Sequence, residues 1–168
     1  MEFDVLQLKN HLLDLVTNRV LLCAAMAWFA AQFIKIFTSF RQETHFSFRR
    51  FLLGSGGMPS SHSAVVCATC FSCGILYGFG SAWFAVSAVL AVVVMRDAAG
   101  VRREAGKQAA VINQLSAELE KRRKHKVSIT LAEVLGHTPL QVVIGALLGT
   151  ALAFFCQSFL FDTLFGAI

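Results

Sequence analysis

Two histidines in this sequence stand next to residues that begin helices. The first, His62, closes a glycine-rich segment from Gly54 to Ser63 that runs straight into an apolar stretch. Glycines permit close backbone approach, Pro59 suits a first helical turn, and the free N–H groups of a helix start can bind an anion. His62 adds a group that titrates near neutral pH. The segment is therefore either part of an anion site or a simple helix cap.

The second histidine, His137, precedes the last apolar stretch. Thr138 is followed by Pro139, and Gln141 stands three positions after Thr138, which is the pattern of a capping box. This predicts a helix start and leaves His137 on its N-terminal side. Further along, Gly145 and Gly149 permit close helix packing, either within one chain or against a second copy.

Three charged positions lie where apolar stretches end. Lys35 is near the end of the first long apolar stretch, and Gln32 stands one helical turn earlier. A lysine at this depth either has a function or extends its ammonium group to the headgroups. Arg96 and Asp97 follow the third apolar run, where an arginine is suited to bidentate phosphate contact and the carboxylate could pair with it or orient a histidine. The alternative is an ordinary helix end with a charge pair.

The elements that position these residues are predicted to be membrane helices. The chain has 168 residues, 56% of them hydrophobic, and a mean hydropathy of +0.64, so the bilayer is the expected solvent. Val20 to Phe40 and Leu140 to Phe161 are long enough to cross about 30 Å of hydrocarbon. Ala64 to Phe79 and Ala82 to Met95 are shorter and predict a helical hairpin. The expected fold class is all-α, a single polytopic membrane domain over residues 1–168 with about four transmembrane helices.

Two further segments alternate apolar and charged residues. The first 19 residues predict an N-terminal amphipathic helix at the interface, and they lack the basic start and the cleavage site of a signal peptide. Asp97 to Lys126 predicts an amphipathic helix on the cytoplasmic surface. Its basic tail, Lys121 to Lys126, either binds anionic headgroups or acts as a solvated topology signal.

The five cysteines do not predict a disulfide framework, because their number is odd and four of them lie inside apolar segments. Cys67, Cys70 and Cys73 have the spacing of an iron–sulfur run. Since positions i, i+3 and i+6 of one hydrophobic helix do not wrap a cluster, we interpret them as small packing residues and predict no metal site.

The positive charges predict the orientation. Of the fifteen Lys and Arg residues, nine lie between Arg96 and Lys126 and three between Arg41 and Arg50. These loops flank the hairpin, so they fall on one side, which the positive-inside rule makes cytoplasmic. We therefore expect an integral protein of the bacterial inner (plasma) membrane, with the anion-binding candidates at the cytoplasmic end of the bundle. Clustering of the charges in membrane loops argues against a nucleic-acid partner.

These motifs resemble the type-2 phosphatidic acid phosphatase superfamily, which includes vanadium haloperoxidases, and above all its small divergent branch. Pro59-Ser60-Ser61-His62 resembles the Pro-Ser-Gly-His motif of that family, and His137 to Gly149 resembles the segment that begins with its nucleophilic histidine. Gly56 to Ser63, Arg96 to Arg103 and Gly136 to Pro139 are similar to the divergent branch. The resemblance covers Gln32 to Gly149.

The resemblance implies a set of site residues and no metal or other cofactor. His137 would form a phosphohistidine and His62 would protonate the leaving oxygen, with Asp97 as a third catalytic candidate. The residues implied to bind the substrate phosphate are Lys35, Ser60, Ser61, Arg96, Arg102 and Arg103. The histidine-orienting position, an acid in the family, is Gln141 here, and the lysine and arginine spacings also differ from the family pattern.

The expected function is metal-independent hydrolysis of a lipid phosphate or diphosphate, with the bilayer and a phosphorylated lipid as partners and a homodimer as a further possibility. Because an amide cannot stabilise an imidazolium by charge, a second function stays open. It is a non-catalytic protein of the same fold that binds phosphate or a lipid headgroup.

Overall fold

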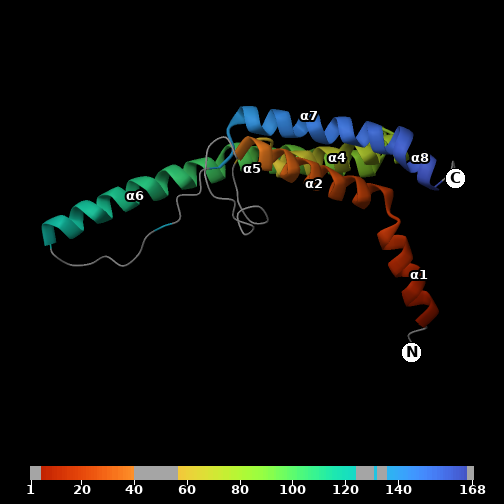
Figure 1. Cartoon of the computed structure of the whole chain (residues 1–168), viewed down its shortest axis with the longest axis horizontal. Helices are drawn as coiled ribbons and strands as arrows, with labels where there is room; N and C mark the ends of the chain where they lie inside the picture. Colours follow the sequence, from red (N-terminus) through yellow and green to blue (C-terminus); the bar gives the residue numbers. More distant parts are fainter. Residues whose placement is uncertain (1–4, 40–56, 124–130, 132–135, 166–168) are drawn as a thin grey trace.

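The computed structural model describes residues 5–39, 57–123, 131 and 136–165. The elements in these ranges are all helical, which confirms the all-α fold class. Figure 1 shows helices lying side by side in an elongated bundle, with one helix projecting from each end. The basic segment Arg41 to Arg50, Gly54 to Gly56 of the glycine-rich segment and Lys124 to Lys126 of the basic tail lie outside the described residues.

The bundle consists of α2 (Arg19–Ser39), α4 (Ser61–Tyr77), α5 (Ala82–Ala99) and α7 (Pro139–Phe155). Helix α4 is the central element and packs against the other three. Its buried residues are small: Ser61, Ser63, Ala64, Cys67, Ala68, Cys70, Ser72, Cys73 and Gly74. Small side chains allow helices to approach closely in a membrane, where apolar burial alone gives little driving force. Cys67, Cys70 and Cys73 are therefore packing residues, with free thiols.

Two glycines of α7 make the closest of these approaches. A Cβ atom at Gly145 would overlap the backbone oxygen of Ser60, and one at Gly149 would overlap the backbone oxygen of Ala64. The glycine pair thus packs against α4 within one chain. The sequence allowed these glycines to pack within one chain or against a second copy, and the structure shows packing within one chain.

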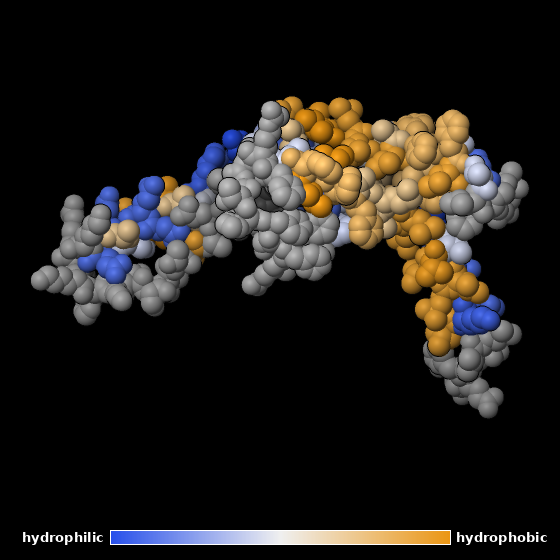
Figure 2. Space-filling view, viewed as in Figure 1, coloured by the Kyte–Doolittle hydropathy of each residue, from blue (hydrophilic) through white to orange (hydrophobic). Residues whose placement is uncertain are grey.

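In the part of the chain that the structure describes, three helical stretches are long and apolar enough to cross a membrane: Arg19–Thr38, Ala82–Glu120 and Pro139–Thr163. The first arm of the expected hairpin is α4, whose 17 residues extend over about 26 Å at about 1.5 Å per residue. This is shorter than the hydrocarbon layer of about 30 Å. Helix α4 is nevertheless enclosed by its neighbours, while large apolar side chains such as Phe29, Val86 and Leu147 face outward. Figure 2 shows this apolar surface over the bundle, as expected for an integral membrane protein.

The helices at the two ends differ in direction. Helix α1 (Val5–Val16) leaves the bundle steeply (Figure 1). Its residues Leu8, Leu12, Leu13 and Leu15 are exposed, as expected for an interfacial helix. Helix α6 (Val101–Arg123) begins after a break at Gly100, four residues later than the sequence pattern predicts, because α5 continues to Ala99. It projects outward from the end of the bundle that is opposite to α1.

The last apolar stretch is not one continuous α-helix. After α7 the chain forms a π-helical turn, η1 (Cys156–Leu160), and a short helix, α8 (Phe161–Phe165). Arg19 at the start of α2 binds the Asp162 side chain at 3.3 Å and the carbonyl oxygen of Phe161 at 3.4 Å. The two contacts connect the start of α2 to α8, at the end of the bundle opposite α6.

Candidate active site

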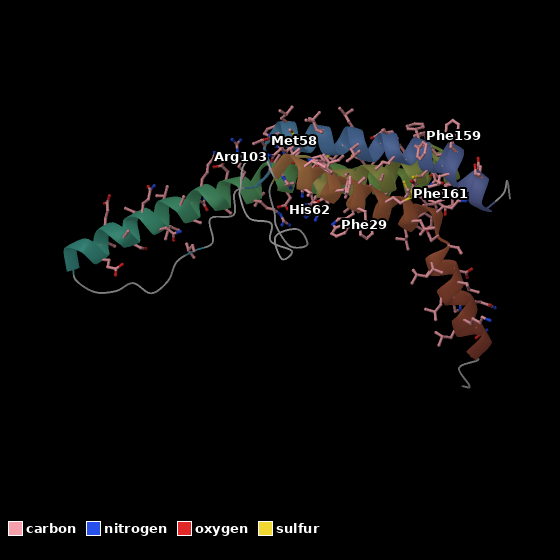
Figure 3. The ribbon with its side chains drawn as sticks, in the orientation of Figure 1. Phe29, Met58, His62, Arg103, Phe159 and Phe161 are labelled. Atoms are coloured by element: carbon pink, nitrogen blue, oxygen red, sulfur yellow. The ribbon has the colours of Figure 1, made fainter. Side chains whose placement is uncertain are left out.

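The two histidine segments meet at the end of the bundle from which α6 departs. The backbone N–H of Ser60 donates to the carbonyl oxygen of Gln141 at 3.0 Å, and that of His137 donates to the carbonyl oxygen of Ala98 at 3.0 Å. These two bonds join the start of α4, the start of α7 and the end of α5. Figure 3 shows His62, Met58 and Arg103 at this same end, far from Phe161.

The histidines themselves face each other. Their ring centroids are 6.0 Å apart, with an angle of 61° between the planes. His62 is exposed, whereas only 3% of the His137 surface is accessible. One imidazole is therefore positioned to exchange protons with water, and the other is enclosed by protein.

The hydrogen bonds of Gln141 determine the tautomer of His137. Oε1 of Gln141 accepts the Thr138 backbone N–H at 3.0 Å, which completes the predicted capping box. The same oxygen lies 3.3 Å from Nδ1 of His137. Since an amide oxygen can only accept, Nδ1 must carry the proton. Nε2 then has a free lone pair, and this buried atom has no hydrogen-bond partner among the described residues.

The surroundings of His137 favour its neutral form. Burial is the main cause that lowers the pKa of His137 below its ordinary value of 6.5. The positive charges of Lys35 and Arg102 and the neighbouring His62 lower it further, while the Gln141 hydrogen bond acts in the opposite direction. At neutral pH the main form of His137 is thus the neutral imidazole, with its one proton on Nδ1.

A buried lysine contacts the start of α4. Lys35 is 9% exposed, and its Nζ donates to Oγ of Ser61 at 3.2 Å. Of the two interpretations of Lys35, the structure favours a role inside the bundle over extension to the headgroups. Ser60 is fully buried and caps α4, because its Oγ accepts the backbone N–H of Ser63 at 3.4 Å.

The arginines of the α5–α6 junction differ in their surroundings. Nε of Arg102 donates to Oδ2 of Asp97 at 2.6 Å, so the acid pairs with this arginine and not with Arg96. Arg102, Lys35 and Asp97 all lie within electrostatic reach of His62. Arg96 and Arg102 are both exposed, and Arg103 is half-buried with its backbone against Gly136, where a Cβ atom would overlap it. Among the described arginines, Arg102 is thus the one whose charge acts on both histidines.

Comparison with known proteins identifies the family of the chain. Residues 16–152 match the model of a family described as the divergent PAP2 family. The chain belongs to the divergent PAP2 family. It is also 40% identical over 156 residues to YuiD, described as an uncharacterized membrane protein of Bacillus subtilis (strain 168), in a match that covers 83% of this chain and 94% of the relative. No solved structure matches the chain.

Membership of the divergent PAP2 family covers all the candidate residues, since each lies between residues 16 and 152. Two supporting contacts were not predicted from the sequence. Oγ1 of Thr38 donates to the carbonyl oxygen of Met58 at 2.8 Å, which fixes the segment before Ser60, and the Ala98 carbonyl holds the His137 backbone. A threonine three residues after Lys35 is a weak hint of the first contact, whereas nothing in the residue type of Ala98 points to the second.

Proposed function

We propose that this divergent PAP2 protein hydrolyses a lipid phosphate or diphosphate, without a metal ion, through a phosphohistidine on His137. The observation that carries the proposal is the buried Nε2 of His137, which has a lone pair and no hydrogen-bond partner among the described residues. A nucleophile requires such a lone pair, and the Nδ1 contact to Gln141 aims the ring.

His62 supplies the proton transfers in this proposal. Nε2 of His137 forms a bond to phosphorus, the bond from phosphorus to the lipid oxygen breaks, and the protonated His62 gives its proton to that oxygen. His62 then takes a proton from a water molecule, whose oxygen attacks phosphorus and breaks the P–N bond. Inorganic phosphate leaves, and both histidines return to their initial states. With ring centroids 6.0 Å apart, both histidines can reach the same phosphoryl group.

The cationic side chains stabilise the charge of the transferred group. Lys35 reaches the start of α4 through Ser61, and Arg102 lies within electrostatic reach of both histidines. The buried Lys35 is the stronger of the two, because a cation fixed in a site of low dielectric acts strongly on the equatorial oxygens of a transferring phosphoryl group, whereas Arg102 is exposed to water. Arg96 and Arg103 are secondary candidates for phosphate contact, because both belong to the same junction. The position of the site at one bundle end favours an amphiphile, whose headgroup reaches it from the bilayer.

The direct test is phosphate release from a panel of lipid monophosphates and diphosphates by the protein purified in detergent. EDTA is present throughout, so that release cannot depend on a divalent cation. We expect release from at least one lipid, and none from the His137→Ala variant. Release that requires an added metal ion would contradict the proposed mechanism.

A second candidate function is binding of phosphate or a lipid headgroup without turnover. Gln141 favours it, because an amide cannot neutralise the imidazolium form of His137 as a carboxylate would. In that case the panel yields no phosphate, but vanadate or inorganic phosphate raises the melting temperature of the wild type and not of the Lys35→Ala variant. The two functions thus give different results in the same preparation.

A further inference from the structure

Three sulfur atoms gather at the end of the bundle opposite the histidine site. This sulfur cluster consists of Cys23, Met26 and Cys156. Cys23 and Met26 stand one turn apart on α2 and so share a face, and Cys156 begins the π-helical turn η1. Both thiols are fully buried, in one core cluster with Phe161, which Figure 3 shows at this end. π-helical turns are rare and occur frequently at functional sites.

The sulfur atoms are close to one another. Sγ of Cys156 lies 3.8 Å from Sδ of Met26, and the thiols of Cys156 and Cys23 are hydrogen-bond partners. Metal–sulfur bonds of about 2.3 Å place the sulfur ligands of a trigonal or tetrahedral ion about 3.8 to 4 Å apart. The distance between Cys156 and Met26 therefore suits two ligands on one ion.

Two polar side chains beside the sulfur cluster have unsatisfied oxygen atoms. Gln157 is 4% exposed, and its Nε2 donates to the carbonyl oxygen of Arg19, one turn before Cys23. Its Oε1 is buried and has no hydrogen-bond partner among the described residues. Oγ of Ser72 on α4 lies close to the Cys23 thiol, at a geometry that leaves this oxygen without a hydrogen bond in the described part of the chain. Such buried atoms are costly, and a ligand bound at the sulfur cluster would relieve that cost.

The donor atoms select a soft cation. The described residues contain no group of three or more histidine, cysteine, aspartate or glutamate side chains that could hold a metal ion, so the third ligand here is a thioether. Zinc takes nitrogen, thiolate and carboxylate ligands, and magnesium and calcium take oxygen ligands. Thiolates together with a thioether favour copper(I).

We propose that Cys23, Met26 and Cys156 bind one copper(I) ion. The two thiols lose their protons to solvent on binding, so that two thiolates, one thioether and the monovalent ion form a complex with one negative charge. This site is separate from the histidine site and does not depend on the proposed function.

A positive side chain stands beside the proposed copper site. The guanidinium of Arg19 donates to the carbonyl oxygen of Phe161, a member of the same core cluster as both thiols. The Arg19 side chain is 22% exposed, whereas that of Asp162, its carboxylate partner, is 51% exposed. Because water screens the carboxylate more than the guanidinium, part of the Arg19 charge is left to balance the negative complex.

Copper(I) titration of the reduced protein in detergent tests the site. Under anaerobic conditions the ion is supplied as its complex with bathocuproine disulfonate, and loss of the absorbance of that complex reports transfer to the protein. We expect one ion per chain in the wild type and none in Cys156→Ser. Cys67→Ser is the matched control and should keep the ion, because the Cys67 thiol also contacts a thioether, at 3.9 Å from Sδ of Met95. No copper in the wild type, or equal loss in both variants, would overturn the proposal.

Met26→Leu covers the case in which a cysteine variant fails to fold. Leucine keeps the volume and apolar character of methionine and removes the thioether. Gel filtration should be unchanged, while the affinity for copper(I) falls at least about tenfold, since loss of even an outer-shell partner costs a metal site that much. An unchanged affinity would contradict the assignment of the thioether, and with it the choice of copper(I).

Thiol counting distinguishes the copper site from a disulfide. We expect all five thiols to react when the protein is unfolded with a copper chelator and without a reductant. Two fewer reactive thiols, restored by Cys23→Ser or Cys156→Ser at the remaining cysteine, would mean that these residues form a disulfide. The proposed copper site would then be wrong.

Discussion

Nδ1 of His137 lies 3.3 Å from Oε1 of Gln141, and the same oxygen accepts a hydrogen bond from the backbone N–H of Thr138, the N-cap residue of α7. One amide thus caps a helix and orients the candidate nucleophile. Any movement of the α7 start changes the direction of the imidazole. This coupling explains why a helix-capping pattern and the candidate nucleophile coincide in the sequence.

Replacement of either histidine is expected to reduce phosphate release at least about 10²-fold, as for the loss of a nucleophile or a general acid. His62→Ala and His137→Ala are the variants. His11→Ala is the matched control, because this third histidine lies on α1 and is exposed. Initial rates on the best lipid of the panel are compared, with gel filtration to verify folding. Wild-type rates in either variant would refute the assignment.

The rate of the wild-type protein should fall in acid as His137 becomes protonated. Burial lowers the pKa of His137 below 6.5, so the neutral, nucleophilic form persists to a pH below that value. We expect the acid limb of the kcat/KM profile to have its midpoint below pH 6.5. The same shift makes folding stability decrease as pH falls from 6.5 towards the folded pKa, because the unfolded chain binds the proton more readily. A midpoint above 6.5 would contradict the burial of this imidazole.

Gln141→Glu should preserve the fold, because glutamate also completes a capping box with Thr138. A carboxylate at Nδ1 stabilises the imidazolium, so the acid limb should move to higher pH. If the missing charge limits catalysis, the rate above that limb should rise by no more than about tenfold, since water near the interface screens one charge. An unchanged profile would show that Gln141 acts as a cap alone.

Gly145→Ala and Gly149→Ala should destabilise the bundle. Each new methyl group meets a backbone carbonyl of α4, at Ser60 or Ala64, and backbone cannot yield as a flexible side chain does. Overpacking of this kind costs about 1 to 3 kcal/mol. Thermal unfolding in detergent provides the measurement, and Gly80→Ala is the control because nothing lies within 4 Å of a Cβ there. Equal melting temperatures for all three variants would contradict the close packing of these two glycines against α4.

Much of this arrangement follows from local patterns in the sequence. The capping box at Thr138 fixes the start of α7 through neighbouring residues, and the long apolar runs predict α2 and α7 by length. The end of α5 was predicted too early, since Arg96 and Asp97 are polar yet continue the helix to Ala99. Helix α4 was expected to span the bilayer on hydropathy alone. Its length shows that enclosure by three neighbours can replace a full apolar span.

The site geometry depended on contacts between distant segments, which no local pattern contains. Lys35 and Ser61 are 26 residues apart, and their hydrogen bond results from the packing of α2 against α4. Residue type alone predicted that Asp97 would pair with Arg96 or orient a histidine. The structure pairs it with Arg102 instead, five residues further along the chain and beyond the break at Gly100.

The active-site end of the bundle is predicted to face the cytoplasm. The chain from Arg96 to Lys126 carries nine of the fifteen Lys and Arg residues, whereas the connection between α4 and α5 carries none. Short loops rich in lysine and arginine remain on the cytoplasmic side. Because His137 is bonded through its backbone to Ala98 at the end of α5, the candidate site must lie on the same side as α6.

Thiol labelling of intact cells tests this orientation. Gln114→Cys reports on α6 and Gly80→Cys on the α4–α5 connection, and both positions are exposed while the native cysteines are buried. A membrane-impermeant reagent should label position 80 in intact cells, and position 114 only after permeabilisation. The opposite pattern would place the site at the outer leaflet, where a lipid phosphate of that leaflet would be its substrate. Phosphate release in detergent would be unaffected, so the result concerns the orientation alone and leaves the chemistry to the histidine variants.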